Sequence, residues 1–243
     1  MKVIVIIPAA GLGTRMAGPG IGKAPAKQFT ELNGAPVLIH TLRKFAETAG
    51  VSEIVIALRK QEADNFAPRL DKERFKKPVR IVEGGEHRQE SVANALAAIS
   101  PAPDDLVLVH DAVRPFVDRE IIDNVIEAVK KHGAAIAAVP AVDTIKQVDR
   151  TADGALVNAT IPREHIVLVQ TPQGFRFSVL KQAFDEAARD GFVGTDEASV
   201  VERMGHPVAV VMGSPRNIKI TTPADLELAE FYAGQESKKY VAG

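Results

Sequence analysis

The sequence contains no cysteine among its 243 residues. Disulfides, thiolate zinc sites and cysteine nucleophiles are therefore excluded, and the composition fits a reducing compartment. Long hydrophobic runs are lacking too. The apolar run at residues 3–7 is too short for a signal sequence or a membrane span. We therefore expect a cytoplasmic protein without a membrane partner.

The chain also lacks an excess of either charge. It carries 30 Lys and Arg against 31 Asp and Glu, a formal net charge of −1. Without a basic excess, nucleic acid is not an expected partner. Its six histidines show no metal-ligand spacing. His110 precedes Asp111 on an expected strand and is interpreted as structural.

Short β-branched runs alternate with helical periodicity through the first 139 residues. Strands are expected at about residues 3–7, 53–58, 79–82, 106–109 and 134–139, and helices at about 34–49, 61–70, 88–99 and 119–132. Asp118 is a good N-cap for the last of these helices, and Gly133 is a good stop. The alternation predicts an α/β fold, with a mostly parallel sheet and helices on both faces.

The alternation breaks at about residues 141–170. Apolar and polar residues alternate there around Asp153 and Gly154, which is a hairpin signal. We therefore expect a protruding antiparallel β-arm outside the main sheet. Later elements are expected as helices at about 178–189, 196–204 and 223–232, a strand at 208–211, an extended segment at 216–220 and a frayed tail from 235. No linker is visible, so residues 1–243 are interpreted as one domain.

A glycine-rich stretch follows the first strand and carries Arg15, Lys23 and Lys27. Ligands bind at the carboxyl ends of strands in such sheets, and free N–H groups of glycine loops bind phosphate. The familiar patterns fail, however. Met16 stands where a Rossmann fingerprint needs its third Gly, and Ala24 stands where a Walker A loop needs Ser or Thr. A nicotinamide oxidoreductase and a P-loop NTPase are both disfavoured, and a flexible surface loop is the plain alternative.

Several short motifs occur in order along the chain. They are PAAGLGTRM (8–16) with a downstream Lys-Gln, GGEHRQESV (84–92), VHDAVRPF (109–116), DTIK (143–146), TPQ (171–173), TDEAS (195–199) and NIKIT (217–221). Together they resemble the 2-C-methyl-D-erythritol 4-phosphate cytidylyltransferases, nucleotidyltransferases of the non-mevalonate isoprenoid pathway. The resemblance covers about residues 2–232.

The resemblance implies a Rossmann-like nucleotidyltransferase fold and a homodimer that exchanges its arms. It also implies CMP transfer from CTP to 2-C-methyl-D-erythritol 4-phosphate, with pyrophosphate released and Mg²⁺ (or another divalent cation) on the triphosphate. The implied product is 4-diphosphocytidyl-2-C-methyl-D-erythritol.

The resemblance also implies site residues. The catalytic cations would be Arg15, Lys27 and Lys219. The nucleotide would be bound by Ala9, Ala10, Gly11, Gly13, Gly85, Glu86 and Ser91. The polyol phosphate would be bound by Asp111, Arg114, Thr144, Arg163, Thr171 and Thr195, with Asp111 as a possible magnesium ligand. Thr144 and Arg163 lie in the arm and would serve the partner subunit's site.

Three alternatives remain open. A cytidylyltransferase for ribitol 5-phosphate would share the nucleotide half of the site. A nucleotide-binding regulatory protein without catalysis is an alternative of another class. Arg15, Lys27 and Lys219 argue against it, because binding alone needs fewer cations near the α-phosphate. Lys23 competes with Lys27 for the phosphates, because Ala26 replaces the usual Pro before the Lys-Gln pair and the segment 16–26 is long for the family.

Overall fold

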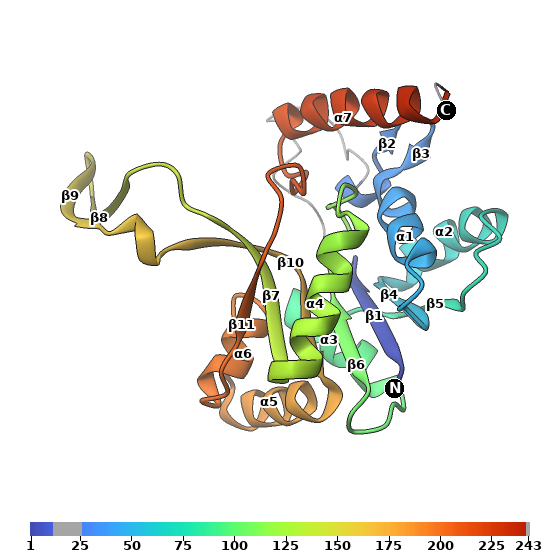
Figure 1. Cartoon of the computed structure of the whole chain (residues 1–243), viewed down its shortest axis with the longest axis horizontal. Coiled ribbons are helices and arrows are strands. Elements are labelled where there is room, and N and C mark those ends of the chain that lie inside the picture. Colours follow the sequence, from blue (N-terminus) through green and yellow to red (C-terminus); the bar gives the residue numbers. More distant parts are fainter. Residues whose placement is uncertain (12–25, 242–243) are drawn as a thin grey trace.

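A seven-stranded sheet forms the centre of the molecule, in the order β11-β7-β10-β6-β1-β4-β5 (Figure 1). The structure, a computed structural model, describes residues 1–11 and 26–241, with side chains through residue 235. The strands of the sheet are β1 (Val3–Pro8), β4 (Glu53–Leu58), β5 (Val79–Glu83), β6 (Leu106–Val109), β7 (Ala134–Pro140), β10 (Val167–Arg176) and β11 (Ala209–Met212). All neighbours are parallel except β10, which is antiparallel to β6 and β7. The predicted mostly parallel α/β fold is confirmed.

Helices cover both faces of the sheet (Figure 1). They are α1 (Val37–Glu47), α2 (Lys60–Lys72), α3 (Arg88–Ala97), α4 (Arg119–His132), α5 (Phe177–Asp190) and α6 (Glu197–Arg203). A further helix, α7 (Pro223–Val241), crosses the top of the molecule in Figure 1, beyond the ends of the strands. Side chains of β1 alternate between the faces. Val5 and Ile7 pack in the cluster that α1, α2 and α4 cover, whereas Ile4 and Ile6 pack in the cluster that α3, α5 and α6 cover. This double burial explains the unbroken apolar run of β1.

Helix α4 shows how local sequence sets the ends of an element. The Asp118 carboxylate accepts a hydrogen bond from the Ile121 N–H at 2.8 Å. Gly133 follows the last turn with φ 84°, a conformation that costs glycine little. The predicted start and stop of this helix are both confirmed.

The arm is a hairpin that projects from the body (Figure 1). Its strands are β8 (Ile145–Thr151) and β9 (Gly154–Ile161), paired antiparallel in a sheet of their own. A short 3-10 helix, η3 (Arg163–His165), leads back to the body. The hairpin predicted around Asp153 and Gly154 is therefore confirmed.

The segment after the arm corrects the sequence prediction. The arm was expected to reach residue 170, with no strand between it and the helix at about 178–189, but β10 begins at Val167 and lies between β6 and β7. Pro172 and Gly174 hide this strand, because both residues are unfavourable in strand interiors. Gly174 is needed there, since a Cβ on it would lie 2.7 Å from atoms of Leu108 and Val129.

The boundaries of several other elements also differ from the sequence predictions. Two short strands, β2 (Glu31–Leu32) and β3 (Ala35–Pro36), form a hairpin where the first helix was expected to begin, so α1 starts at Val37. Asn33 and Gly34 make its turn with positive φ of 48° and 81°. The segment 216–220, expected to be extended, begins with a turn at residue 216 and a bend at residue 217, and only 218–220 have neither turn nor bend. The expected frayed tail from residue 235 is also wrong, since α7 continues to Val241.

Candidate active site

A cavity of about 250 Å³ opens at the carboxyl ends of β1 and β6. It is lined by Pro8, Ala10, Gly11, Lys27, Gln28, Arg88, Ser91, Asp111, Ala112, Val113 and Lys219. β1 has β4 on one side and β6 on the other. The chain runs from β1 to β4 and returns later to β6, so this crevice is a topological switch point of the sheet. Ligands bind at such points in open α/β sheets.

The first loop is held in place by a glutamine. The amide of Gln28 donates hydrogen bonds to the carbonyl oxygens of Ala9, at 2.6 Å, and Gly11, at 3.3 Å. Gln28 is only 2% exposed, and it lies in the 3-10 turn η2 (Lys27–Phe29). These bonds join the beginning and the end of the glycine-rich loop, and they bring Lys27 to the cavity wall. Gly13, Arg15 and Lys23 lie outside the described residues.

A second turn packs against the first loop. A Cβ on Gly84 would lie 2.6 Å from the Ala10 Cβ, so only glycine allows this close approach. The Gly85 N–H donates to the Ser91 hydroxyl at 3.0 Å, and the same hydroxyl lies 3.0 Å from the His87 carbonyl oxygen. Two of the segments expected to read the base therefore lie side by side. Glu86 is exposed and does not line the cavity.

Asp111 is the charged centre of the cavity and is 7% exposed. Its Oδ2 lies 2.9 Å from the Lys219 Nζ and 3.2 Å from the Arg114 Nε, and its Oδ1 lies 3.4 Å from the Arg88 Nε. Burial acts to raise the pKa of Asp111, but the charges of Arg88, Lys219 and Arg114 hold that pKa well below its usual range. Asp111 is therefore ionised at any working pH.

A hydrogen-bonded chain fixes the backbone of Asp111 from below. Burial lowers the pKa of His110 to about 3, so the ring is neutral. Its Nε2 lies 3.1 Å from the Arg114 carbonyl oxygen, which can only accept, so Nε2 carries the hydrogen. The bare Nδ1 then accepts from the Thr171 hydroxyl at 3.1 Å, and the Thr171 oxygen accepts from the Asp111 N–H at 3.0 Å. His110 therefore has the structural role expected of it, because it holds the Thr171 hydroxyl that binds the Asp111 N–H. It was expected on a strand, but β6 ends one residue before it.

A bulge in β10 puts Thr171 where it can make these bonds. The pairing of β10 with β7 shifts register between Val169 and Gln173, so the residues between them leave the ladder. Thr171 is 4% exposed, and its hydroxyl serves Asp111 and His110 within the protein. The substrate contact expected of Thr171 stays a prediction.

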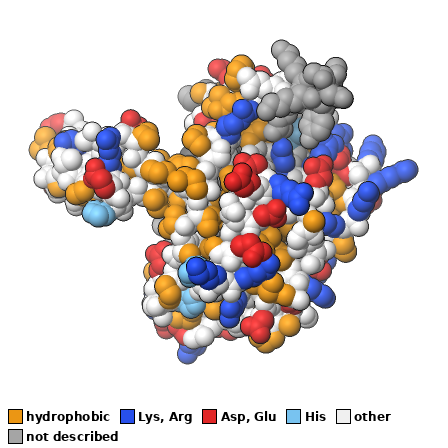
Figure 2. Space-filling model, viewed as in Figure 1, with side chains coloured by type: hydrophobic (Ala, Val, Ile, Leu, Met, Phe, Trp, Pro, Cys, Tyr) orange, Lys and Arg blue, Asp and Glu red, His pale blue; other side chains and the backbone are white. Residues whose placement is uncertain are grey.

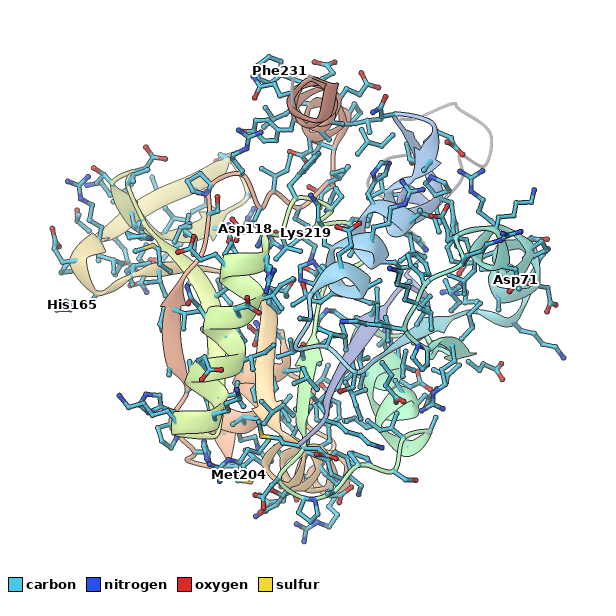
Figure 3. The ribbon with its side chains drawn as sticks, turned by 45° about the vertical axis from the view of Figure 1, so that its right-hand side comes forward. Asp71, Asp118, His165, Met204, Lys219 and Phe231 are labelled. Carbon is cyan, nitrogen blue, oxygen red and sulfur yellow. The ribbon has the colours of Figure 1, made fainter. Side chains whose placement is uncertain are left out.

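Asn217 ties the lysine segment to the same support. The side-chain amide of Asn217 donates to the backbone carbonyl oxygen of Thr171 at 2.9 Å, and the backbone carbonyl oxygen of Asn217 accepts from the Arg114 Nη1 at 2.7 Å. Asn217 is fully buried. Lys219 follows two residues later and reaches the middle of the molecule in Figure 3, below the helix that carries Phe231.

A long-range ion pair borders the cavity on the side of α6. The Arg88 Nη1 lies 2.5 Å from the Glu197 Oε1, and Glu197 is 1% exposed. Burial raises the pKa of Glu197, and Arg88 opposes that effect. Thr195 is exposed just before the N-cap Asp196, whose carboxylate accepts from the Ser199 N–H at 2.9 Å. Asp196 therefore caps α6, and the substrate contact expected of Thr195 stays a prediction.

The arm residues lie away from the cavity of their own chain. Thr144 and Arg163 are exposed and do not line it, and Arg163 donates from Nη1 to the Val142 carbonyl oxygen at 2.6 Å. Figure 3 shows His165, two residues further on, at the outer edge of the arm, far from Lys219. Of the expected site residues, those that line the cavity are Ala10, Gly11, Lys27, Ser91, Asp111 and Lys219. Arg114 joins them through its ion pair with Asp111, whereas Ala9, Gly85, Glu86, Thr144 and Arg163 do not line the cavity.

Four residues at the site were given no role by sequence reasoning: Gln28, Arg88, Glu197 and Asn217. Each lies inside or next to a motif that carried the resemblance, so the motif itself was the available signal. Their partners are distant in sequence, and Arg88 and Glu197 are 109 positions apart. Nothing local in the sequence reports such a pairing.

Within the described part of the chain, no group of three or more His, Cys, Asp or Glu side chains could hold a metal ion. Asp111 is the carboxylate at the cavity, and three cations already surround it. No helix in that part is long and apolar enough to cross a membrane.

Comparison with known proteins decides the family. A family model described as 2-C-methyl-D-erythritol 4-phosphate cytidylyltransferase matches residues 3–235. The chain belongs to this family. It is therefore a cytidylyltransferase, as the ordered motifs predicted.

Individual relatives agree with this family. The chain is 56% identical over 239 residues to the 2-C-methyl-D-erythritol 4-phosphate cytidylyltransferase of Acidobacterium capsulatum, covering 98% of this chain and 100% of that one. It is 52% identical to that of Solibacter usitatus, covering 98% of each. The crystal structure of the Francisella tularensis enzyme superposes with a TM-score of 0.78 at 38% identity, covering 95% of this chain and 99% of that one. That of the Thermus thermophilus enzyme gives 0.74 at 36% identity, with 96% and 99% covered.

Proposed function

We propose that the chain transfers CMP from CTP to 2-C-methyl-D-erythritol 4-phosphate, releasing pyrophosphate and forming 4-diphosphocytidyl-2-C-methyl-D-erythritol. The relatives named above carry that activity in their names, and none of them is named for ribitol 5-phosphate. The observation that carries the proposal is the cavity itself, which joins glycine and alanine backbone to Lys27, Arg88 and Lys219. Phosphoryl transfer needs such positioning and cationic stabilisation more than covalent chemistry.

The substrate phosphate would attack the α-phosphorus in line. A phosphate monoester is already largely ionised at pH 7, since its second pKa is about 6, so no general base is required. Two anions must be brought together, and cations must offset their repulsion. Lys27 and Lys219 would stabilise charge on the α-phosphate, with Arg15 assigned by resemblance. Lys219 is held by Asp111 at 2.9 Å, which fixes its direction.

The residues of the cavity fit a divalent cation that is held mainly by the substrate phosphates. Mg²⁺ is usually bound through one or two carboxylates and the phosphates of the substrate. Among the described residues, Asp111 is the one carboxylate that lines the cavity, so it would supply a single protein ligand. When bound, the ion would neutralise charge on the triphosphate. The cytoplasmic location stays a prediction.

We also propose a homodimer in which each arm completes the partner's site. Support comes from the arm and its base, where large apolar side chains are exposed: Val142, Val148, Leu156, Val157, Val167, Leu168 and Val169. Figure 2 shows hydrophobic side chains gathered where the arm joins the body. Exposed apolar patches of this kind mark protein contacts. Thr144 and Arg163 lie beside them and would bind the substrate phosphate, for which an arginine fork is well suited.

Mixing two inactive variants tests the exchange. Arg163→Ala would lack a working arm and Lys219→Ala a working site. In a mixed dimer, one site would combine the intact Lys219 of one chain with the intact Arg163 of the other. An equal mixture should therefore recover about a quarter of the wild-type activity after subunit exchange. No recovery, with exchange demonstrated by tag pull-down, would contradict the arrangement.

Turnover on paired substrates tests the reaction. Pyrophosphate release is measured with CTP, Mg²⁺ and either 2-C-methyl-D-erythritol 4-phosphate or ribitol 5-phosphate. We expect rapid turnover with the first polyol phosphate and little with the second. Faster turnover with ribitol 5-phosphate would replace the substrate assignment. CTP binding without turnover on either would favour a regulatory protein.

A further inference from the structure

Arg88 lies between two carboxylates that come from distant parts of the chain. Its Nη1 is 2.5 Å from the Glu197 Oε1, and its Nε is 3.4 Å from the Asp111 Oδ1. Arg88 is the first residue of α3, and Glu197 is the first residue of α6. The guanidinium therefore spans from α6 to the charged centre of the cavity.

Glu197 is buried, and among the residues that the structure describes Arg88 is its single ionic partner. It is 1% exposed, its Oε1 is bound to Arg88, and its buried Oε2 has no hydrogen-bond partner within the same part of the chain. A buried ion pair is weak support for stability, because desolvation offsets much of the attraction. What such a pair does supply is a fixed orientation, since a guanidinium donates in a rigid fork.

The mechanical link between these helices does not depend on Glu197. The neighbouring Gln89 joins α3 to the loop before α6 by two hydrogen bonds. Its amide donates to the Phe192 carbonyl oxygen at 3.0 Å, and its carbonyl oxygen accepts from the Gly194 N–H at 2.8 Å. The hydrogen bonds of Gln89 therefore already attach α3 to the loop before α6. What the ion pair between Arg88 and Glu197 adds is a fixed direction for the Arg88 side chain.

The charged groups around Asp111 explain why the direction of the Arg88 side chain matters. In the ion-pair cluster around Asp111, the cations are Arg88, Arg114 and Lys219, and Glu197 is the second carboxylate, bound to Arg88. Without Glu197, Arg88 would turn its whole fork to Asp111 and compete there with Lys219. The oxygens of Asp111 would then be less available to the polyol phosphate.

We propose that Glu197 is a positioning residue that holds Arg88 at a fixed distance from Asp111 and so keeps Asp111 available to the polyol phosphate. The nucleotide side should be independent of it. Gly85 and Ser91 are held by their own hydrogen bonds, at 3.0 Å to each other and 3.0 Å to His87. The inference rests on the proposed assignment of Asp111 to the polyol phosphate.

Glu197→Gln tests the proposal, because it removes the charge and keeps the shape. We expect kcat/KM for the polyol phosphate to fall by roughly tenfold or more, while the Kd for CTP changes by less than about twofold. Asp190→Asn is the matched control. It makes the same exchange in an ion pair between Arg203 of α6 and Asp190, which is half-exposed and away from the cavity. This control should leave both parameters unchanged.

A double-mutant cycle shows whether Glu197 acts through Arg88. In an Arg88→Gln background, Glu197→Gln should cause little further loss. Full additivity of the two losses would overturn the proposal, and so would an unchanged kcat/KM in Glu197→Gln. If Glu197→Gln does not fold, Glu197→Asp replaces it, because the shorter side chain keeps the charge but withdraws the carboxylate from Arg88. An unchanged kcat/KM for the polyol phosphate in Glu197→Asp would then overturn the proposal.

Asp111→Asn separates this inference from the function on which it rests. If Asp111→Asn leaves the KM for the polyol phosphate unchanged, the assignment of Asp111 is wrong. If Asp111→Asn raises that KM and Glu197→Gln does not, the assignment stands and the positioning role is wrong.

Discussion

Replacing Thr171 with valine tests the hydrogen-bonded support beneath Asp111. Valine has nearly the shape of threonine but cannot donate to the His110 Nδ1 or accept from the Asp111 N–H. Both groups are buried, because His110 is fully buried and Thr171 is 4% exposed. The variant therefore leaves one buried donor and one buried acceptor without partners.

The size of the effect follows from these two groups. An unsatisfied buried polar group costs about 1–3 kcal/mol, so the two groups together should lower the free energy of unfolding by roughly 2–6 kcal/mol. For a chain of this length, each kcal/mol lowers Tm by about 2–4 °C, which gives a Tm loss of roughly 4–24 °C. Activity should fall too, because the backbone of Asp111 loses its fixed position.

Thermal unfolding at one protein concentration is the assay, with two controls. Thr171→Ser keeps the hydroxyl and should retain most of the stability. Thr160→Val removes a hydroxyl from the arm, where it bonds Lys146 in an exposed position, and should change stability by no more than about 0.5 kcal/mol. A Tm for Thr171→Val within 2 °C of that for Thr160→Val, by the ~2–4 °C per kcal/mol conversion, would refute the reasoning.

Two further predictions concern pH and the nucleotide loop. The pKa of His110 is about 3 in the fold and about 6.5 in the unfolded chain, so between these pH values only the unfolded chain binds the extra proton. As the pH falls from 6.5 to 4, His110 should therefore lower the free energy of unfolding by about 1.4 kcal/mol per pH unit. Urea unfolding of His110→Gln should lack this share of the slope, and an unchanged slope would contradict the buried neutral ring. Gly84→Ala should weaken CTP binding by about tenfold or more, because its Cβ would lie 2.6 Å from the Ala10 Cβ and displace the loop. Gly234→Ala, with nothing within 4 Å of the new Cβ, is the control and should bind CTP normally.

The sequence by itself determined the layered fold, because that information is local. Each apolar run of period two or 3.6 reports which side of one element is buried. Asp118 and Gly133 mark the ends of α4 through backbone requirements that act within a single turn. The ordered motifs also placed Asp111 and Lys219 among the candidate residues before any geometry was known.

Only the tertiary structure decided how these residues act together. β10 was missed because Pro172 and Gly174 weaken its strand signal, while packing against Leu108 and Val129 favours it. Arg88 and Glu197 meet across 109 residues, and Asn217 reaches Thr171 across 46. Such contacts depend on where the sheet brings its loops, so no local pattern encodes them. The support beneath Asp111 is therefore a property of the fold, although its members lie in motifs that the sequence displays.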